Sequence, residues 1–268
     1  MRRFELNKHL RNGHADIDDN HPYCRIDLST PAIDKSLTIR GISNLFVECG
    51  PNPFSLYLLL NKGACVKLQI IAPNKPTDWM LNVALDEGTT LQATMVDFAS
   101  FGGVVTINGE LFGQGSRLDW HLASLTRNDD VKKYIVNFSH KAKDTTAHMR
   151  NFGVIEDKGH LTFTGKSHIL QGAIRSSTHQ TARIMVFDAN SVGKANPFLA
   201  IDDNDVSASH AATVGKINEE HMFYLKTRGL NDDEARRLIT YGYLAPSIKE
   251  FSDRKIRDRL TTQLQVRL

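Results

Sequence analysis

The sequence predicts a β-rich body followed by a helical C-terminal part. Apolar and polar residues alternate over much of residues 65–212, glycine and asparagine turn signals separate the alternating segments, and three capped helix starts follow residue 217. Alternation with a period of two places one set of side chains on one face of a strand. We therefore divide the chain into an N-terminal segment (1–64), a β-rich body (65–217) and a helical part (218–268).

The N-terminal segment leads into the body and carries weaker patterns, with short apolar runs around 45–47 and 56–60. The three cysteines of the chain, Cys24, Cys49 and Cys65, all lie in its first quarter. An odd number of cysteines without a Cys-x-x-Cys spacing argues against a disulfide framework and against a metal knuckle. We therefore expect free thiols, some of them buried, and any metal site made of these thiols alone would need a partner chain.

Short strands are expected throughout the body. They begin near residue 66, then at 91, 104, 118, 134, 146 and 161, with a later one near 184. From 91 onward these starts are too close together for crossover helices, which excludes a doubly wound α/β fold. A β-sandwich, a barrel and a solenoid all fit this spacing, and the spacing alone does not choose among them.

The helical part opens at Asn218, a residue type that caps helices. Glutamates fill the first expected turn and basic residues the last, before Gly229, so each charge has the sign that the helix dipole favours. Phe223, Tyr224 and Leu225 lie on this helix, where such a run is more typical of core packing than of a partner surface.

Two more helix starts follow. Asn231 with Glu234 has the form of a capping box, and we expect this helix to stop at Pro246. Ser247 with Glu250 forms a second box, which predicts a third helix from that point. Its apolar stripe is formed by Ile256, Leu260 and Leu264.

Composition excludes several classes of function. A net charge of +3 and a pI near 8.7 fall short of the basic excess that a nucleic-acid-binding protein uses to contact phosphates. The sequence has no apolar run long enough for a membrane span and no signal-peptide pattern at its start, so we expect a cytoplasmic protein. It also lacks the P-loop, nucleophile-elbow and His-Glu-x-x-His motifs, which argues against ATPase, hydrolase and protease activity.

One segment resembles a known family. Residues 197–217 read Pro-Phe-Leu-Ala-Ile-Asp-Asp-Asn-Asp-Val-Ser-Ala-Ser-His-Ala-Ala-Thr-Val-Gly-Lys-Ile. This run, and the motifs that follow it, resemble the C-terminal signature of the SufB/SufD family, and the similarity extends over about residues 150–247. The further matching motifs are Phe152-Gly153-Val154, the stretch 159–166, Thr178-His179-Gln180, Phe223-Tyr224-Leu225, Arg228-Gly229 and Glu234-Ala235-Arg236.

The resemblance implies a fold and a role. It implies an all-β right-handed β-helix (solenoid) over 65–217 with an α-helical C-terminal domain over 218–268. It also implies a non-catalytic scaffold subunit for iron–sulfur cluster assembly, which pairs with a SufB-like chain or with a second copy of itself. A SufC-like ATPase would dock on the C-terminal helices. The His-Ala-Ala-Thr-Val-Gly form of the signature is more similar to SufD than to SufB.

The resemblance also singles out His210 as the candidate cofactor-binding and metal-binding residue. It matches a family histidine placed at the SufB–SufD interface, and a neutral imidazole nitrogen is a sound ligand for iron. Ala208 and Ala211 stand where family members carry a cysteine and a glutamate, and neither can coordinate metal. A transient iron–sulfur cluster would therefore take at most one ligand from this signature and the others from the partner chain.

A β-helix enzyme acting on polysaccharide is the alternative. Such an enzyme needs paired carboxylates at catalytic spacing on one face. The acidic residues in or just after the clearest middle strands are Asp97, Asp119 and Asp188, and no two of them share a strand. The scaffold reading is therefore favoured.

Overall fold

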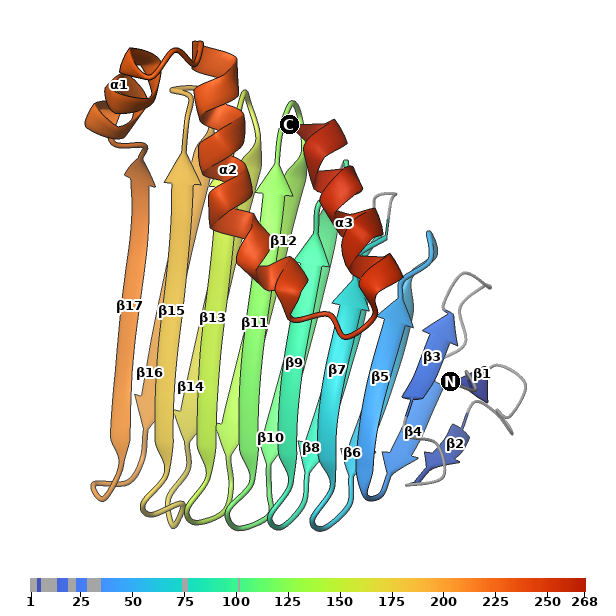
Figure 1. Ribbon diagram of the computed structural model, residues 1–268. Coiled ribbons are helices and arrows are strands. Elements are labelled where there is room, and N and C mark those ends of the chain that lie inside the picture. The colour runs from blue at the N-terminus through green and yellow to red at the C-terminus, as the bar shows by residue number, and fades with distance from the viewer. Residues whose placement is uncertain (1–3, 6–13, 19–22, 28–34, 74–76, 101) are drawn as a thin grey trace.

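The protein is described from a computed structural model that places residues 4–5, 14–18, 23–27, 35–73, 77–100 and 102–268. The chain forms a parallel β-helix with two sheets and three C-terminal helices (Figure 1). The odd-strand sheet contains, in spatial order, β1 (Phe4–Glu5), β3 (Tyr23–Asp27), β5 (Ile42–Glu48), β7 (Cys65–Ile71), β9 (Thr90–Asp97), β11 (Arg117–Thr126), β13 (Thr146–Ile155), β15 (Ser177–Val186) and β17 (Ser207–Lys216). The even-strand sheet contains β2 (His14–Ile17), β4 (Lys35–Ile39), β6 (Phe54–Leu60), β8 (Trp79–Leu85), β10 (Gly103–Leu111), β12 (Val131–His140), β14 (His160–Ile169) and β16 (Val192–Ile201).

Each strand passes to the opposite sheet, and every strand pairing in the described part of the chain is parallel. This arrangement confirms the expected β-helix body. It excludes the β-sandwich and the barrel. The pairing is continuous across residue 65, because β5 pairs with β7 from Ile42–Cys65 to Glu48–Ile71. The described strands of residues 1–64 thus continue the two sheets of the body.

The interior of the solenoid is filled by columns of side chains from successive coils. One column of the odd-strand sheet runs through Leu68, Ala93, Trp120 and Met149, which are in register on adjacent strands and buried. The opposite sheet contributes large rings, including Tyr134. Alternation within each strand therefore becomes stacking between strands, and burial of these apolar side chains stabilises the coil.

Three helices follow the last strand: α1 (Glu219–Thr227), α2 (Asp232–Lys249) and α3 (Arg254–Arg267). Figure 1 shows α2 and α3 crossing the outward face of the odd-strand sheet near one end of its strands. Their apolar side chains, with Phe251 between them, pack against that face, so this end of the sheet has a second hydrophobic core. Its main members are Val96, Ala123, Leu125, Val154, Leu244, Ile248, Phe251, Leu260 and Leu264.

The caps at Asn218 and Asn231 are confirmed, since Asn218 accepts from the Glu220 amide and Asn231 forms the full capping box with Glu234. The expected stop at Pro246 is wrong, because α2 continues through this proline to Lys249. The start expected at Ser247 is wrong as well, since α3 begins at Arg254.

Tertiary packing explains both corrections. Leu244 and Ile248 are buried against the sheet on either side of Pro246, and this contact keeps the last turn of α2 helical. The Ser247 hydroxyl lies 3.3 Å from His121 Nε2 on β11 instead of capping a helix. Asp253 takes the capping role for α3 by accepting from the Lys255 amide.

Polar side-chain contacts also connect the helices to the solenoid. The Thr240 hydroxyl donates to Glu156 at 3.0 Å, and Arg236 contacts both oxygens of Asp188 at 3.0 Å. Burial raises the pKa of Glu156, against the opposing effect of Arg127. The helical part therefore packs against the solenoid through both apolar and polar contacts.

None of the described helices is long and apolar enough to span a lipid bilayer.

Candidate functional site

The C-terminal end of the solenoid is open in the described part of the chain. β17 pairs only with β15, and β16 pairs only with β14, so each of these ten-residue strands has one unpaired edge. The Ser207 amide donates to the carbonyl of Ser176, just before β15, and the Ile217 amide donates to that of Val186, the last residue of β15. Because successive amides of a strand alternate in direction, the N–H groups that face the open edge are those of Ala208, His210, Ala212, Val214 and, at the end of the strand, Lys216.

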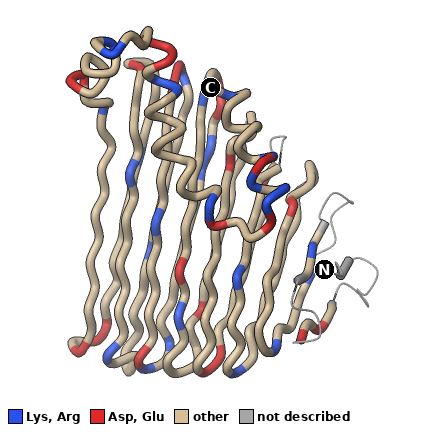
Figure 2. The backbone as a smooth tube through the Cα atoms, viewed as in Figure 1, with Lys and Arg blue, Asp and Glu red and all other residues tan. Residues whose placement is uncertain are grey.

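Open strand edges in natural proteins usually carry devices that prevent pairing with another chain, such as charges and prolines. β17 has one charged residue, Lys216 at its end, and Figure 2 shows this strand, at the left, almost without charge along its length. In β16, Pro197 lacks an N–H and interrupts the edge. β17 is therefore the less protected of the two edges.

The last coil also leaves a section of the interior uncovered. Ala208, His210, Ala212 and Val214 are in register with inward-facing residues of β15. In β15 the corresponding side chains are buried, whereas Val214 is 43% exposed. The end of the solenoid is thus a surface with the side-chain pattern of a core, which is typical of an interaction site.

His210 lies at the centre of this end surface. It continues the interior column above Gln180, and its neighbours along the inward face, Ala208 and Ala212, cannot coordinate a metal ion. No group of three His, Cys, Asp or Glu side chains in the described ranges could hold a metal ion. The end surface therefore presents a single imidazole.

A polar layer lies directly below His210. The Thr178 hydroxyl donates to Ser167 Oγ at 2.9 Å, and Gln180 Nε2 donates to Ser167 Oγ at 2.8 Å and to the Phe198 carbonyl at 3.0 Å. Earlier coils have Trp120 and Met149 in the same column as Gln180. Periodicity alone does not predict this layer, although the polar residues at alternate positions of Thr178-His179-Gln180 are its signal.

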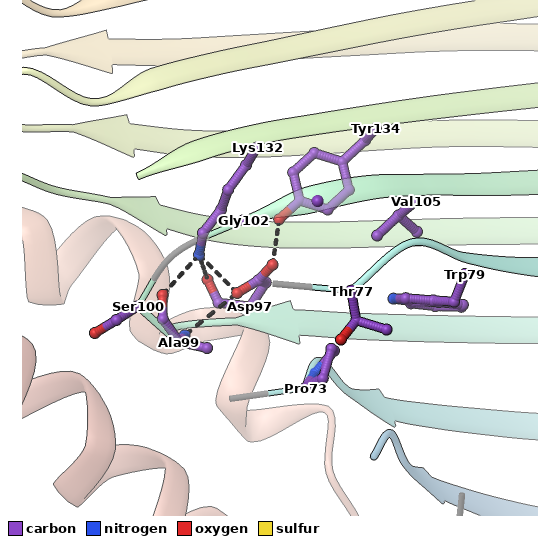
Figure 3. A pocket seen from close by; sticks show the side chains of 11 residues that line it. Pro73, Thr77, Trp79, Asp97, Ala99, Ser100, Gly102, Val105, Lys132 and Tyr134 are labelled. Carbon is purple, nitrogen blue, oxygen red and sulfur yellow. Dashed lines mark hydrogen bonds and ion pairs between the residues drawn. The ribbon is translucent and has the colours of Figure 1, made fainter. Parts of the chain in front are cut away.

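A second cluster of ionisable groups lies inside the solenoid, at the corner between β9 and β12 (Figure 3). Lys132 Nζ is 2.6 Å from Asp97 Oδ1 and also donates to the carbonyl oxygens of Ala99 and Leu125, at 2.9 and 2.8 Å. Tyr134 donates to the other Asp97 oxygen at 2.6 Å. Burial and the Asp97 charge raise the pKa of Tyr134 well above its ordinary value.

The cavity beside this cluster measures about 10 Å³, which is room for one water molecule. The lysine ammonium and the aspartate carboxylate are already occupied by protein partners. The charged groups of this cluster are therefore engaged within the protein.

The three cysteines are free thiols, as expected, with Cys24 and Cys49 buried and Cys65 exposed. Burial raises the pKa of Cys24 to about 12, and burial with the nearby Asp97 and Glu48 charges raises the pKa of Cys49 well above its ordinary value. Because the thiolate is the metal-binding form, neither buried cysteine is prepared to act as a ligand.

The expectation that Phe223 and Tyr224 pack in a core is wrong, since they are 70% and 55% exposed. The helix α1 has no buried residue, because it extends beyond the last strand and has no sheet beneath it (Figure 1). The Arg228 guanidinium lies 5.2 Å from the Tyr224 ring centroid. The exposed aromatic pair is a second candidate surface, and periodicity alone could not locate it.

The three carboxylates considered for the alternative enzyme hypothesis each form an ion pair or a hydrogen bond with a different residue. Asp97 binds Lys132, Asp119 binds His148 at 2.7 Å, and Asp188 binds Arg236. No two of these three carboxylates share a strand or a binding partner, so they do not form the pair that glycoside hydrolysis requires.

Comparison with known proteins identifies the family. Residues 58–243 match the family model described as SUF system FeS cluster assembly, SufBD core domain. The chain is 30% identical over 155 residues to the iron–sulfur cluster assembly protein SufD of Bacillus subtilis, covering 58% of this chain and 36% of that protein. It is 30% identical over 115 residues to SufD of Escherichia coli, covering 43% of this chain and 27% of that protein.

The chain thus matches about a third of the length of these relatives. The family model covers well over half of this chain, from β6 through most of α2. The match includes the open end of the solenoid, His210 and α1. The chain belongs to the SufB/SufD family of iron–sulfur cluster assembly proteins.

Proposed function

We propose that this chain is a non-catalytic, SufD-like scaffold subunit that pairs end to end with a SufB-like chain and docks a SufC-like ATPase on its C-terminal helices. The observation that carries the proposal is the open last coil, with its β17 edge uncharged up to Lys216 and its exposed core-like side chains. A partner strand added to this edge would satisfy the free N–H groups and cover the apolar end. A second copy of this chain is the alternative partner. Free thiols throughout support a reducing compartment, the cytoplasm.

His210 would lie inside the interface of such a pair, which we call the seam. It faces inward at the last coil, so a coil stacked on β17 would enclose its imidazole between the two chains. Iron–sulfur clusters usually require several thiolates, which the end surface of this chain lacks. We therefore assign the cluster to the seam as a transient cargo, with one ligand from His210 and the others from the partner.

His210→Ala should lower the iron and sulfide content of the reconstituted complex without preventing its assembly. The side chain is exposed in the single chain, so the free energy of unfolding should change by no more than about 0.5 kcal/mol. The measurement is anaerobic reconstitution with the SufB-like partner, followed by iron and sulfide analysis. His160→Ala, on the outward face of β14, is the matched control.

Equal iron and sulfide contents for His210→Ala, His160→Ala and the unmodified chain would contradict the ligand role. The scaffold role would then rest on the pairing surface alone.

The ATPase-docking surface is assigned to α1. Exposed aromatic residues next to arginine have the composition of interface hot spots, and truncating such an anchor typically costs about 2 kcal/mol or more. We expect Phe223→Ala combined with Tyr224→Ala to weaken binding of a SufC-like ATPase at least tenfold, measured by calorimetry. Val266→Ala, which removes an 81% exposed apolar side chain from α3, is the control.

Point substitutions suit this test better than removal of residues 218–268. Removal would uncover the sheet face beneath α2 and α3, including Ala123 and Val154. Unchanged affinity in the double variant would show that the ATPase binds elsewhere.

A further inference from the structure

Figure 1 shows that the helices cover the outward face of the odd-strand sheet near the ends of its strands. A row of polar side chains crosses the same face near the starts of these strands. Asp119 on β11 is in register with His148 on β13, His148 with His179 on β15, and His179 with Ser209 on β17. The row therefore places two histidines side by side on adjacent strands, which lie about 4.8 Å apart.

The outer members of the row hold the two imidazoles in opposite orientations. His148 Nδ1 lies 2.7 Å from Asp119 Oδ1, on the β11 side, and His179 Nδ1 lies 2.6 Å from Ser209 Oγ, on the β17 side. In an imidazole ring, Nε2 lies on the flank opposite Nδ1. Because the two Nδ1 atoms point away from each other, each ring turns the side that carries Nε2 toward the other strand of the β13–β15 pair.

The hydrogen bonds also determine which nitrogen of each ring carries the lone pair. A carboxylate only accepts, so the neutral His148 ring carries its proton on Nδ1 and has its lone pair on Nε2. For His179, the Thr181 hydroxyl lies 3.2 Å from Nε2 and can donate to its lone pair, which leaves the Nδ1 proton for Ser209. A metal ion at Nε2 would take the place of this Thr181 hydrogen bond. Metal-bound histidines typically use their second nitrogen in this way.

We propose that His148 and His179 form a site for a first-row divalent transition-metal ion, bound by their two Nε2 atoms. Imidazole nitrogen is a good ligand for such ions. No third His, Cys, Asp or Glu ligand is in place within the described ranges, so water completes the coordination and the ion remains exchangeable. The neighbouring charges are Asp119, which favours a cation, and Arg150, two residues further along β13, which opposes it.

This site is separate from the proposed cluster site. His148 and His179 are on the outward face of the sheet, whereas His210 faces the interior from the last coil. The inference therefore goes beyond the scaffold role and does not depend on it. An ion held with open coordination positions near the end of the solenoid is available for transfer.

The test is calorimetric titration of the full, tag-free chain with Ni²⁺ alone. We expect the tightest class of sites to lose at least tenfold in affinity in His148→Ala and also in His179→Ala. Asp119→Asn keeps both ligands but weakens the orienting bond, and it should cost about tenfold to a hundredfold. His168→Ala is the matched control, because His168 also binds a carboxylate, Asp202 at 2.6 Å, but its in-register neighbours are serine and alanine. It should bind Ni²⁺ as the unmodified chain does.

Paramagnetic broadening provides a second measurement that needs no variant. Substoichiometric Ni²⁺ should broaden the ring signals of His148 and His179 together, before that of His168. The proposal is wrong if either histidine can be removed without loss of affinity, or if the two ring signals respond independently.

Discussion

Ala212→Pro should weaken pairing with a SufB-like partner at least about thirtyfold while the single chain still folds. The Ala212 N–H faces the open edge of β17 and takes no part in the β15 ladder, so its loss breaks no bond within the chain. In the complex it leaves a partner carbonyl without a donor, at a cost of about 2 kcal/mol. The chain already contains a precedent, because Pro197 occupies an equivalent edge-facing position in β16.

Ala212→Ser is the control, because it adds a polar atom and keeps the N–H. Sedimentation equilibrium of each variant with the partner measures the dissociation constant, and circular dichroism checks the β-helix. Tight pairing by Ala212→Pro would mean that the partner binds a different surface.

Asp97→Ala should destabilise the protein by about 3–5 kcal/mol, the largest stability effect we expect for a single polar residue. The substitution leaves the Lys132 ammonium, whose side chain is 2% exposed, without the only anionic partner it has among the described residues. It also removes the oxygen that accepts from Tyr134. The remaining carbonyl contacts of Lys132 do not neutralise a buried charge.

A double variant separates the charge effect from the loss of packing. Asp97→Asn combined with Lys132→Met removes both charges and nearly keeps the volume, so it should recover much of the stability lost in Asp97→Ala. Urea unfolding of the three proteins gives the comparison. If Asp97→Ala costs less than about 1 kcal/mol, the buried pair does not stabilise this corner.

The fold was predictable where local pattern and tertiary structure agree. Alternation located the strands of the body, and side-chain capping located the first two helix starts at Asn218 and Asn231. Strand spacing could not distinguish a solenoid from a sandwich, because both use short strands joined by tight turns. The end of α2 was missed at Pro246, where contacts of Leu244 and Ile248 with the sheet outweigh the local preference of proline.

A functional residue was predictable from the sequence only where it lies within a contiguous family signature. The signature identified His210, but its inward direction follows from the register of β17 on β15. The His148–His179 pair had no signal, since these residues are brought together only by strand register. Lys132 and Asp97 are 35 positions apart and on different sheets, and they meet because the coil brings the end of β9 next to the start of β12.

Hydrogen exchange of the β17 amides tests the central claim most directly, because it reports on the proposed seam itself. In the single chain these edge-facing amides are free of the sheet ladder and should exchange fast, whereas in the complex with a SufB-like partner they should become protected. The amides to follow are those of Ala208, His210, Ala212 and Val214. If a stable complex forms and these four amides exchange as fast as in the single chain, while protection appears elsewhere, the open end of the solenoid is not the pairing surface.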